Sequence, residues 1–92
     1  MLDSPEWILE WTQSADSQLR KLDNPVMQRI LKKLQWLSQS EQPIGLLKPL
    51  KNNRSGQLSL RVQDYRVIIE LFETERTILI IEVGHRKYIY DA

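Results

Sequence analysis

Basic side chains are concentrated in one part of this 92-residue sequence. Between positions 48 and 66 a single acid, Asp64, accompanies five bases: Lys48, Lys51, Arg54, Arg61 and Arg66. Arg86 follows later, directly after the only histidine, His85. A guanidinium keeps its proton in proteins and presents a fixed fork that suits phosphate oxygens. The arginines therefore predict a phosphate site and a nucleic-acid partner, although a solvated basic loop has a similar composition.

Breaking a phosphodiester also requires proton transfer, which arginine cannot perform. The side chains that could move a proton here are those of His85, Tyr90, Lys48 and Lys51. His85 is the leading candidate for the base, and the alternative is an imidazole that only caps a strand end. Tyr90 could orient the nucleophile, donate a proton or stack on a base, or else it seals the sheet. Lys48, Lys51 and Arg54 are candidates to hold RNA phosphates, with a solvated loop as the alternative.

Composition excludes several other kinds of chemistry. The sequence has no cysteine, which excludes disulfides, thiolate metal sites and a cysteine nucleophile. One histidine and scattered acids give no reason to expect a metal or another cofactor. No apolar run approaches the roughly 18 residues of a membrane helix, and the N-terminus lacks the pattern of a signal peptide. We therefore expect a cytoplasmic protein with no membrane partner.

The first half of the chain predicts a strand followed by a helical hairpin. Chains of this length suit a single domain, here residues 1–92. An aromatic and β-branched segment at 7–12 predicts an edge strand, with the start of a helix as the alternative. Ser14 is the expected N-cap of a first helix, and Asn24 caps a second in which Pro25 takes the first helical position. The apolar stripe of the second helix, which should end near Ser38, consists of Val26, Ile30, Leu34 and Leu37.

From Gln57 onward the apolar period changes from that of a helix to two. Leucines and valine at 58, 60 and 62 alternate with polar residues, so Arg61 should project from the opposite face. A tight turn at 63–64 leads into a strand that carries Arg66, and the apolar run 77–83 predicts a central strand covered on both faces and ended by Gly84. Residues 88–90 add a short extended segment. The expected fold is α+β: a β-α-α-β-β-β chain whose mostly antiparallel sheet carries the helical hairpin on one face.

The second half also contains a recognisable series of segments. They read KPLK at 48–51, LRVQDYRVI at 60–68 and VGHR at 83–86, and they are followed by Tyr90. Their order and spacing resemble the RelE/ParE superfamily of bacterial and archaeal toxins, and the resemblance to its RelE-like members covers nearly the whole chain. The helical hairpin lies where that family has its own.

The resemblance implies an mRNA interferase, the toxin of a type II toxin–antitoxin system. Such a toxin enters the ribosomal A site and cuts the bound mRNA without a metal, through attack of the RNA's own 2′-hydroxyl on the adjacent phosphate. A cognate antitoxin neutralises it, and operator DNA is contacted only through the antitoxin complex. By motif position, Arg61, Arg66 and Arg86 correspond to the family's cationic active-site residues, and Tyr90 to its C-terminal tyrosine.

The sequence departs from the family pattern at three positions. Gln57 and Ser59 stand where well-studied members carry lysine or arginine, and Gln63 replaces a common glycine. These changes leave two other interpretations open. One is a ParE-like toxin that binds DNA gyrase and cuts nothing. The other is a degenerate, non-enzymatic member that only binds its partner.

Overall fold

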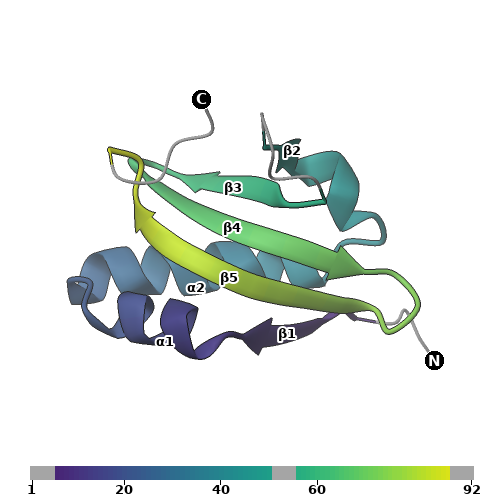
Figure 1. The fold of residues 1–92 in the computed structure, drawn as a ribbon, viewed down its shortest axis with the longest axis horizontal. Helices are drawn as coiled ribbons and strands as arrows, with labels where there is room; N and C mark the ends of the chain where they lie inside the picture. Colours follow the sequence, from purple (N-terminus) through teal and green to yellow (C-terminus); the bar gives the residue numbers. More distant parts are fainter. Residues whose placement is uncertain (1–5, 51–55, 88–92) are drawn as a thin grey trace.

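Two helices pack against one face of a five-stranded sheet (Figure 1). The computed structural model describes residues 6–50 and 56–87. The strand order is β1-β5-β4-β3-β2, and β1 alone runs parallel to its neighbour. The elements are β1 (Ile8–Trp11), α1 (Gln13–Arg20), α2 (Asn24–Ser38), the 3-10 helix η1 (Pro43–Leu46), β2 (Lys48–Pro49), β3 (Leu58–Val62), β4 (Tyr65–Phe72) and β5 (Thr77–His85). The α+β fold with a helical hairpin on one face is confirmed, and η1 and β2 are additions that the sequence did not predict.

Both helices begin earlier than the sequence indicated, α1 by two residues and α2 by one. Thr12 rather than Ser14 is the N-cap of α1, and its Oγ1 accepts a hydrogen bond from the Ala15 N–H at 3.0 Å. Thr12 is the N-cap because, at the end of β1, it has the extended backbone that a cap requires. The N-cap of α2 is Asp23, so Asn24 is the first helical residue and Pro25 lies inside the first turn. Proline is tolerated there because the first N–H groups of a helix have no partner within it.

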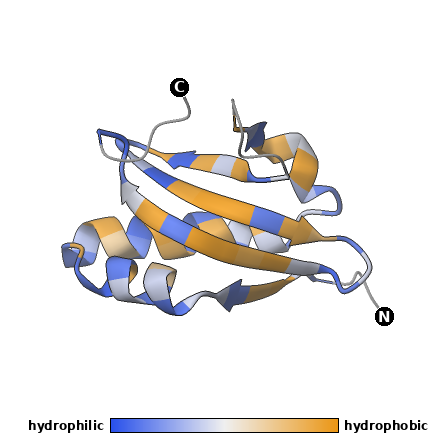
Figure 2. Cartoon of the chain, in the orientation of Figure 1, coloured by the Kyte–Doolittle hydropathy of each residue, from blue (hydrophilic) through white to orange (hydrophobic). Residues whose placement is uncertain are grey.

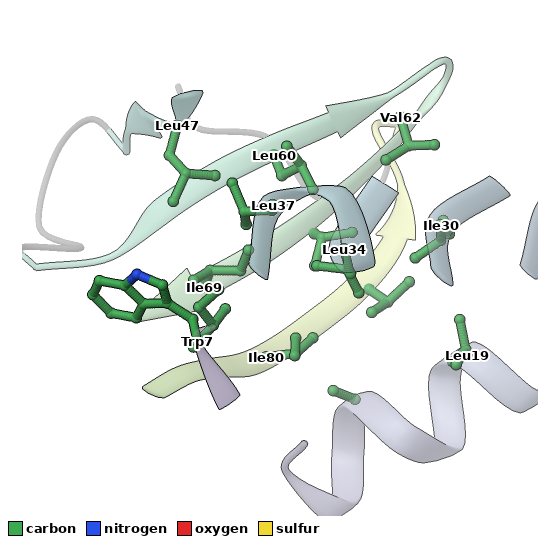
Figure 3. Packing of buried hydrophobic residues seen from close by; sticks show 14 residues of the cluster. Trp7, Leu19, Ile30, Leu34, Leu37, Leu47, Leu60, Val62, Ile69 and Ile80 are labelled. Atoms are coloured by element: carbon green, nitrogen blue, oxygen red, sulfur yellow. The ribbon is translucent and has the colours of Figure 1, made fainter. Parts of the chain in front are cut away.

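The core lies between the helices and the sheet face that they cover (Figure 3). Ile30, Leu34 and Leu37 of α2 are completely buried, as the predicted stripe requires. They form one cluster with inward-facing residues of the sheet, which are Leu60, Val62, Val67, Ile69, Ile78, Ile80 and Val83. Trp7 joins the same cluster and is only 4% exposed. This packing fixes which face of each strand points away from the helices, and on that second face Arg61 is exposed whereas Ile68 is completely buried.

An irregularity in β5 changes which of its residues face the core. Ile68 of β4 is opposite Glu82, whereas Ile69 is opposite Ile80, so Ile81 has no partner on β4. Ile78 and Ile80 point inward before this bulge, and Val83 points inward after it. Strand residues alternate between faces, so one extra residue reverses the alternation.

The bulge also explains the long apolar run that Figure 2 shows along β5. Both helices lie on one side of this run (Figure 1), and Leu79 and Ile81 are partly buried, so the predicted cover is complete on the helix side alone. The apolar positions are adjacent because the alternation shifts within the strand. The strand also continues through Gly84 to His85 instead of ending at the glycine.

Side chains next to the bulge satisfy its backbone groups. The hydroxyl of Thr12 donates to the Ile81 carbonyl at 3.1 Å, and the Val83 N–H donates to Gln18 Oε1 at 2.7 Å. The Thr12 N–H donates to the Ile80 carbonyl at 3.0 Å. Helix α1 and its cap therefore supply the hydrogen bonds that the interrupted ladder cannot.

The Arg61 side chain is held by the turn between β3 and β4. Val62 pairs with Tyr65, which leaves Gln63 and Asp64 as the loop of a two-residue hairpin. Gln63 has a φ of 57°, in the region that favours glycine, and its carbonyl accepts a hydrogen bond from Arg61 Nε at 3.0 Å. The glycine common at this position in the family thus has a conformational reason.

The bulge contact predicts a loss of stability in Gln18→Ala. This change leaves the Val83 N–H without its acceptor in a partly buried place, which typically costs about 1–3 kcal/mol of unfolding free energy. The measurement is chemical denaturation followed by circular dichroism. The matched control is Gln13→Ala, an exposed position on the same helix, which should change the free energy by less than about 0.5 kcal/mol. Equal midpoints for the two variants would contradict the role given to Gln18.

The turn predicts a gain of stability in Gln63→Gly. A left-handed backbone conformation costs a non-glycine residue about 1–2 kcal/mol, part of which the greater freedom of glycine in the unfolded chain offsets. We expect a net gain of about 0.5–1 kcal/mol, seen as a higher melting temperature in a calorimetric scan. Asp64→Gly is the control, because its φ is not positive and it should gain nothing. A gain of the same size at both positions would show that φ is not the cause.

Candidate nucleic-acid interface

Arg61 and Arg66 lie directly opposite each other on β3 and β4. Their neighbours Leu60, Val62 and Val67 are buried in the core, so the two arginines lie on the face that no helix covers. The arrangement confirms the prediction that they are adjacent and face away from the leucines. Like charges directly opposite in a sheet are destabilising. An anionic ligand would reduce the repulsion between them.

Lys48 joins the arginines from strand β2. It is directly opposite Ser59 of β3, and opposed residues of an antiparallel pair project from the same face. Ser59 precedes Arg61 by two residues and therefore shares its face as well. The small Ser59 is buried, at 7% exposure, while Lys48 is exposed. Lys48 thus places a cation beside Ser59, where the family pattern has a lysine or arginine.

These side chains line a pocket at the free edge of β3. Among the described residues, β2 covers β3 only at Leu58 and Ser59, which leaves the remainder of that edge open. The pocket has a volume of about 210 Å³, several times the roughly 30 Å³ that a water molecule occupies in the liquid. We call it the cationic pocket, and its lining residues are Lys33, Trp36, Leu46, Lys48, Ser59, Leu60, Arg61 and Arg66. Four of these carry positive charge, and the described lining contains no acid.

Sequence reasoning missed Lys33 and Trp36 as members of this site. Lys33 lies outside the apolar stripe of α2, a position typical of a solvated helix face. In the structure its Nζ lies 5.2 Å from the ring centroid of Trp36, three residues further along α2. A signal was present in the sequence: a tryptophan outside the apolar stripe, with a lysine one helical turn before it.

His85 does not line the cationic pocket. It pairs with Tyr65, and the two rings meet edge to face with centroids 5.1 Å apart. Tyr65 packs against the core, so His85 lies toward the helix side of the sheet, whereas Gly84 is opposite Arg66. The Nδ1 atom of His85 accepts a hydrogen bond from the Lys87 N–H at 3.1 Å. The bulge in β5 is the physical reason for this orientation, because it reverses the alternation before His85.

Arg86 lies beside the turn that follows Arg61. Its backbone N–H donates to the carbonyl of Asp64 at 2.8 Å, and its side chain is exposed. The structure therefore brings Lys48, Arg61 and Arg66 together and holds Arg86 at the same end of the sheet. The other predicted site residues, Lys51, Arg54 and Tyr90, lie outside the described residues.

The described part of the chain contains neither of two other functional features. Over residues 6–50 and 56–87, no group of three histidine, aspartate or glutamate side chains could hold a metal ion. In the same ranges, no helix has the length and apolar character needed to cross a membrane.

Comparison with known proteins places the chain in a family. Residues 9–90 match the family model described as the ParE toxin of the type II toxin–antitoxin system parDE. No curated protein matches the chain. Among solved structures, a chain of the RelBE2 toxin–antitoxin complex from Mycobacterium tuberculosis is 25% identical with a TM-score of 0.80, and the match covers 91% of this chain and 95% of that one.

Two further structures share the fold at lower identity. The intact RelBE complex from E. coli matches at 20% identity and a TM-score of 0.70, over 86% of this chain and 95% of that one. The chromosomal ParDE system from P. aeruginosa matches at 19% and 0.67, over 89% of this chain and 98% of that one. Since the family model spans nearly the whole sequence, the chain belongs to the ParE toxin family of type II toxin–antitoxin systems, within the RelE/ParE superfamily.

Proposed function

We propose that this toxin is a ribosome-dependent mRNA endoribonuclease. The observation that supports the proposal is the cationic pocket, in which Lys48, Arg61 and Arg66 come together from three strands and whose described lining contains no acid. A site that binds the backbone of a nucleic acid needs this arrangement, since each cation can neutralise a phosphate. A toxin whose only task is to bind a protein partner has less need of opposed arginines.

The proposed reaction is transesterification within the RNA. The 2′-oxygen attacks the adjacent phosphorus, its proton is removed, and the bond from phosphorus to the 5′-oxygen breaks. The products are a 2′,3′-cyclic phosphate and a 5′-hydroxyl, whose oxygen takes up a proton. Arg61, Arg66 and Arg86 are the groups that hold the phosphate and stabilise its extra negative charge in the transition state.

Lys48 is the described residue best placed to protonate the leaving oxygen. Its ammonium group carries three N–H donors and lies with the arginines in the cationic pocket. His85 would have to leave Tyr65 to reach the same place, so we assign it to positioning the start of β4, next to Arg66. Tyr90, which lies outside the described residues, remains the residue that we propose to orient the attacking 2′-hydroxyl.

A cognate antitoxin is the proposed partner that keeps the toxin inactive. The similar structures from M. tuberculosis and E. coli are themselves toxin–antitoxin complexes. The chain exposes large apolar side chains, among them Ile44, Leu46 and Phe72, and such patches are typical of protein interfaces. The ribosome with mRNA in its A site is the proposed target, and operator DNA would be reached only through the antitoxin complex.

Gyrase binding without RNA cleavage is the second candidate. It is favoured by the family model, which is named for ParE, and by the likeness to the ParDE system from P. aeruginosa. The two functions differ in their cellular outcome, since one removes mRNA and the other damages DNA.

Induction of the toxin without antitoxin tests the proposed function. Primer extension should reveal codon-positioned cuts in mRNA, and purified toxin should make the same cuts on programmed ribosomes. Arg61→Ala should slow cleavage by about 10²- to 10³-fold, the usual effect of removing one transition-state donor. Arg29→Ala, an exposed arginine of α2 outside the pocket, should cleave like the wild type. DNA damage without codon-positioned cuts would identify the gyrase-binding function instead.

The rate of single-turnover cleavage tests the assignment of Lys48. In Lys48→Met the rate should fall by about 10²-fold or more, because the proposed proton donor is gone. His85→Phe keeps a ring against Tyr65 and should retain the wild-type rate. If His85→Phe instead slows cleavage as much as Lys48→Met does, the histidine takes part in the reaction and our placement of it is wrong.

A further inference from the structure

Trp36 is an exposed tryptophan for which the fold has no need. It lies on α2 outside the buried stripe, and 49% of its surface is exposed. Trp7, in contrast, is buried in the core. An indole left half in water gives up about half of the stabilisation that its full burial would provide. A contact with a ligand would account for its position.

The indole forms part of the same pocket as the cations. Trp36 and Lys33 line the helix side of the cationic pocket, while Arg61 and Arg66 line the sheet side. The Lys33 ammonium lies 5.2 Å from the centroid of the Trp36 ring, a cation–π distance. This contact restrains the indole and places a positive charge over one face of its ring, so a ligand meets the other face of the indole and the cations together.

Single-stranded RNA is the ligand whose chemistry fits this combination. Its bases stack on aromatic side chains, and its phosphates bind to lysine and arginine. An acidic peptide could satisfy the cations, but it would not generally supply a planar group for the indole. Stacking also tolerates any base, because every base has a flat face.

We propose that Trp36 is a stacking platform for one base of the RNA, next to the phosphate that Arg61 and Arg66 hold. This inference rests on the proposed function and extends it, because it names a nucleotide-binding subsite on α2. Trp36 has no proton to transfer in the reaction, so it contributes to RNA binding and leaves the chemical step unchanged. Loss of the indole should weaken binding by about 5- to 150-fold, the usual range for one stacked base.

The test measures binding of a 2′-O-methyl oligoribonucleotide, which the proposed reaction cannot cut. Fluorescence anisotropy of the labelled oligonucleotide gives the affinity of the full chain. Trp36→Leu should bind about 5- to 150-fold more weakly, and Trp36→Phe, which keeps an aromatic ring, should recover most of the affinity. Lys32→Ala is the matched control, because Lys32 is exposed on the same helix and does not line the pocket.

A set of oligonucleotides with one abasic position completes the test. For one position, removal of the base should weaken binding to the wild type but not to Trp36→Leu, since the lost contact is already absent. A merely structural role for Trp36 would not produce this coupling. The inference is overturned if no abasic position couples to Trp36, if the wild type fails to bind the oligonucleotide, or if Trp36→Leu weakens only the binding of an acidic antitoxin peptide.

Failure of the inference and failure of the proposed function can be told apart. Binding is measured without cleavage, so a coupled base on a toxin that never cuts programmed ribosomes would refute the nuclease function alone. Conversely, codon-positioned cuts by the wild type, with Trp36→Leu unchanged in affinity and in rate, would refute only the stacking role.

Discussion

The extra residue at Ile81 determines the side of the sheet on which the C-terminal part of β5 presents its residues. If β5 alternated regularly through Ile81, Glu82 rather than Val83 would point into the core, and burying a carboxylate among apolar side chains is costly. With the extra residue, Gly84 comes opposite Arg66, whose Nε and Nη1 atoms are buried. The hydrogen bonds from α1 and its cap hold the bulge in place. Helix α1, on one face of the sheet, thus controls which residues of β5 point to the opposite face.

The cationic pocket has an energetic cost that the rest of the domain offsets. Arg61 and Arg66 repel each other across the strands, and Gln63 has a backbone conformation better suited to glycine. Both features lie at the same end of the sheet. The completely buried residues of α2 and the inner strands stabilise the fold enough to tolerate them. Such departures from local preference are expected where a protein binds or reacts, because function selects them against stability.

Sequence patterns predicted the parts of the molecule that follow a regular period. Alternation in β3 placed Arg61 correctly, and the helical stripe placed Ile30 and Leu34 in the core. Sequence patterns could not reveal β2, because a strand of two residues has no period. They also could not locate the bulge, since an unbroken apolar run looks the same with or without a shift in alternation. Because the bulge was not located, the side of the sheet toward which His85 points could not be predicted either.

The missing basic residues at 57 and 59 illustrate a second limit of reading positions one at a time. Electrostatic stabilisation of a phosphate depends on where a charge lies in space and not on which strand carries it. Lys48, opposite Ser59, places an ammonium group on the same face of the sheet as Arg61. A short side chain at 59 also leaves space that a lysine there would fill, and the cationic pocket occupies that space. The substitutions that made the sequence look degenerate therefore coincide with a redistribution of charge, and the proposed chemistry retains its cations.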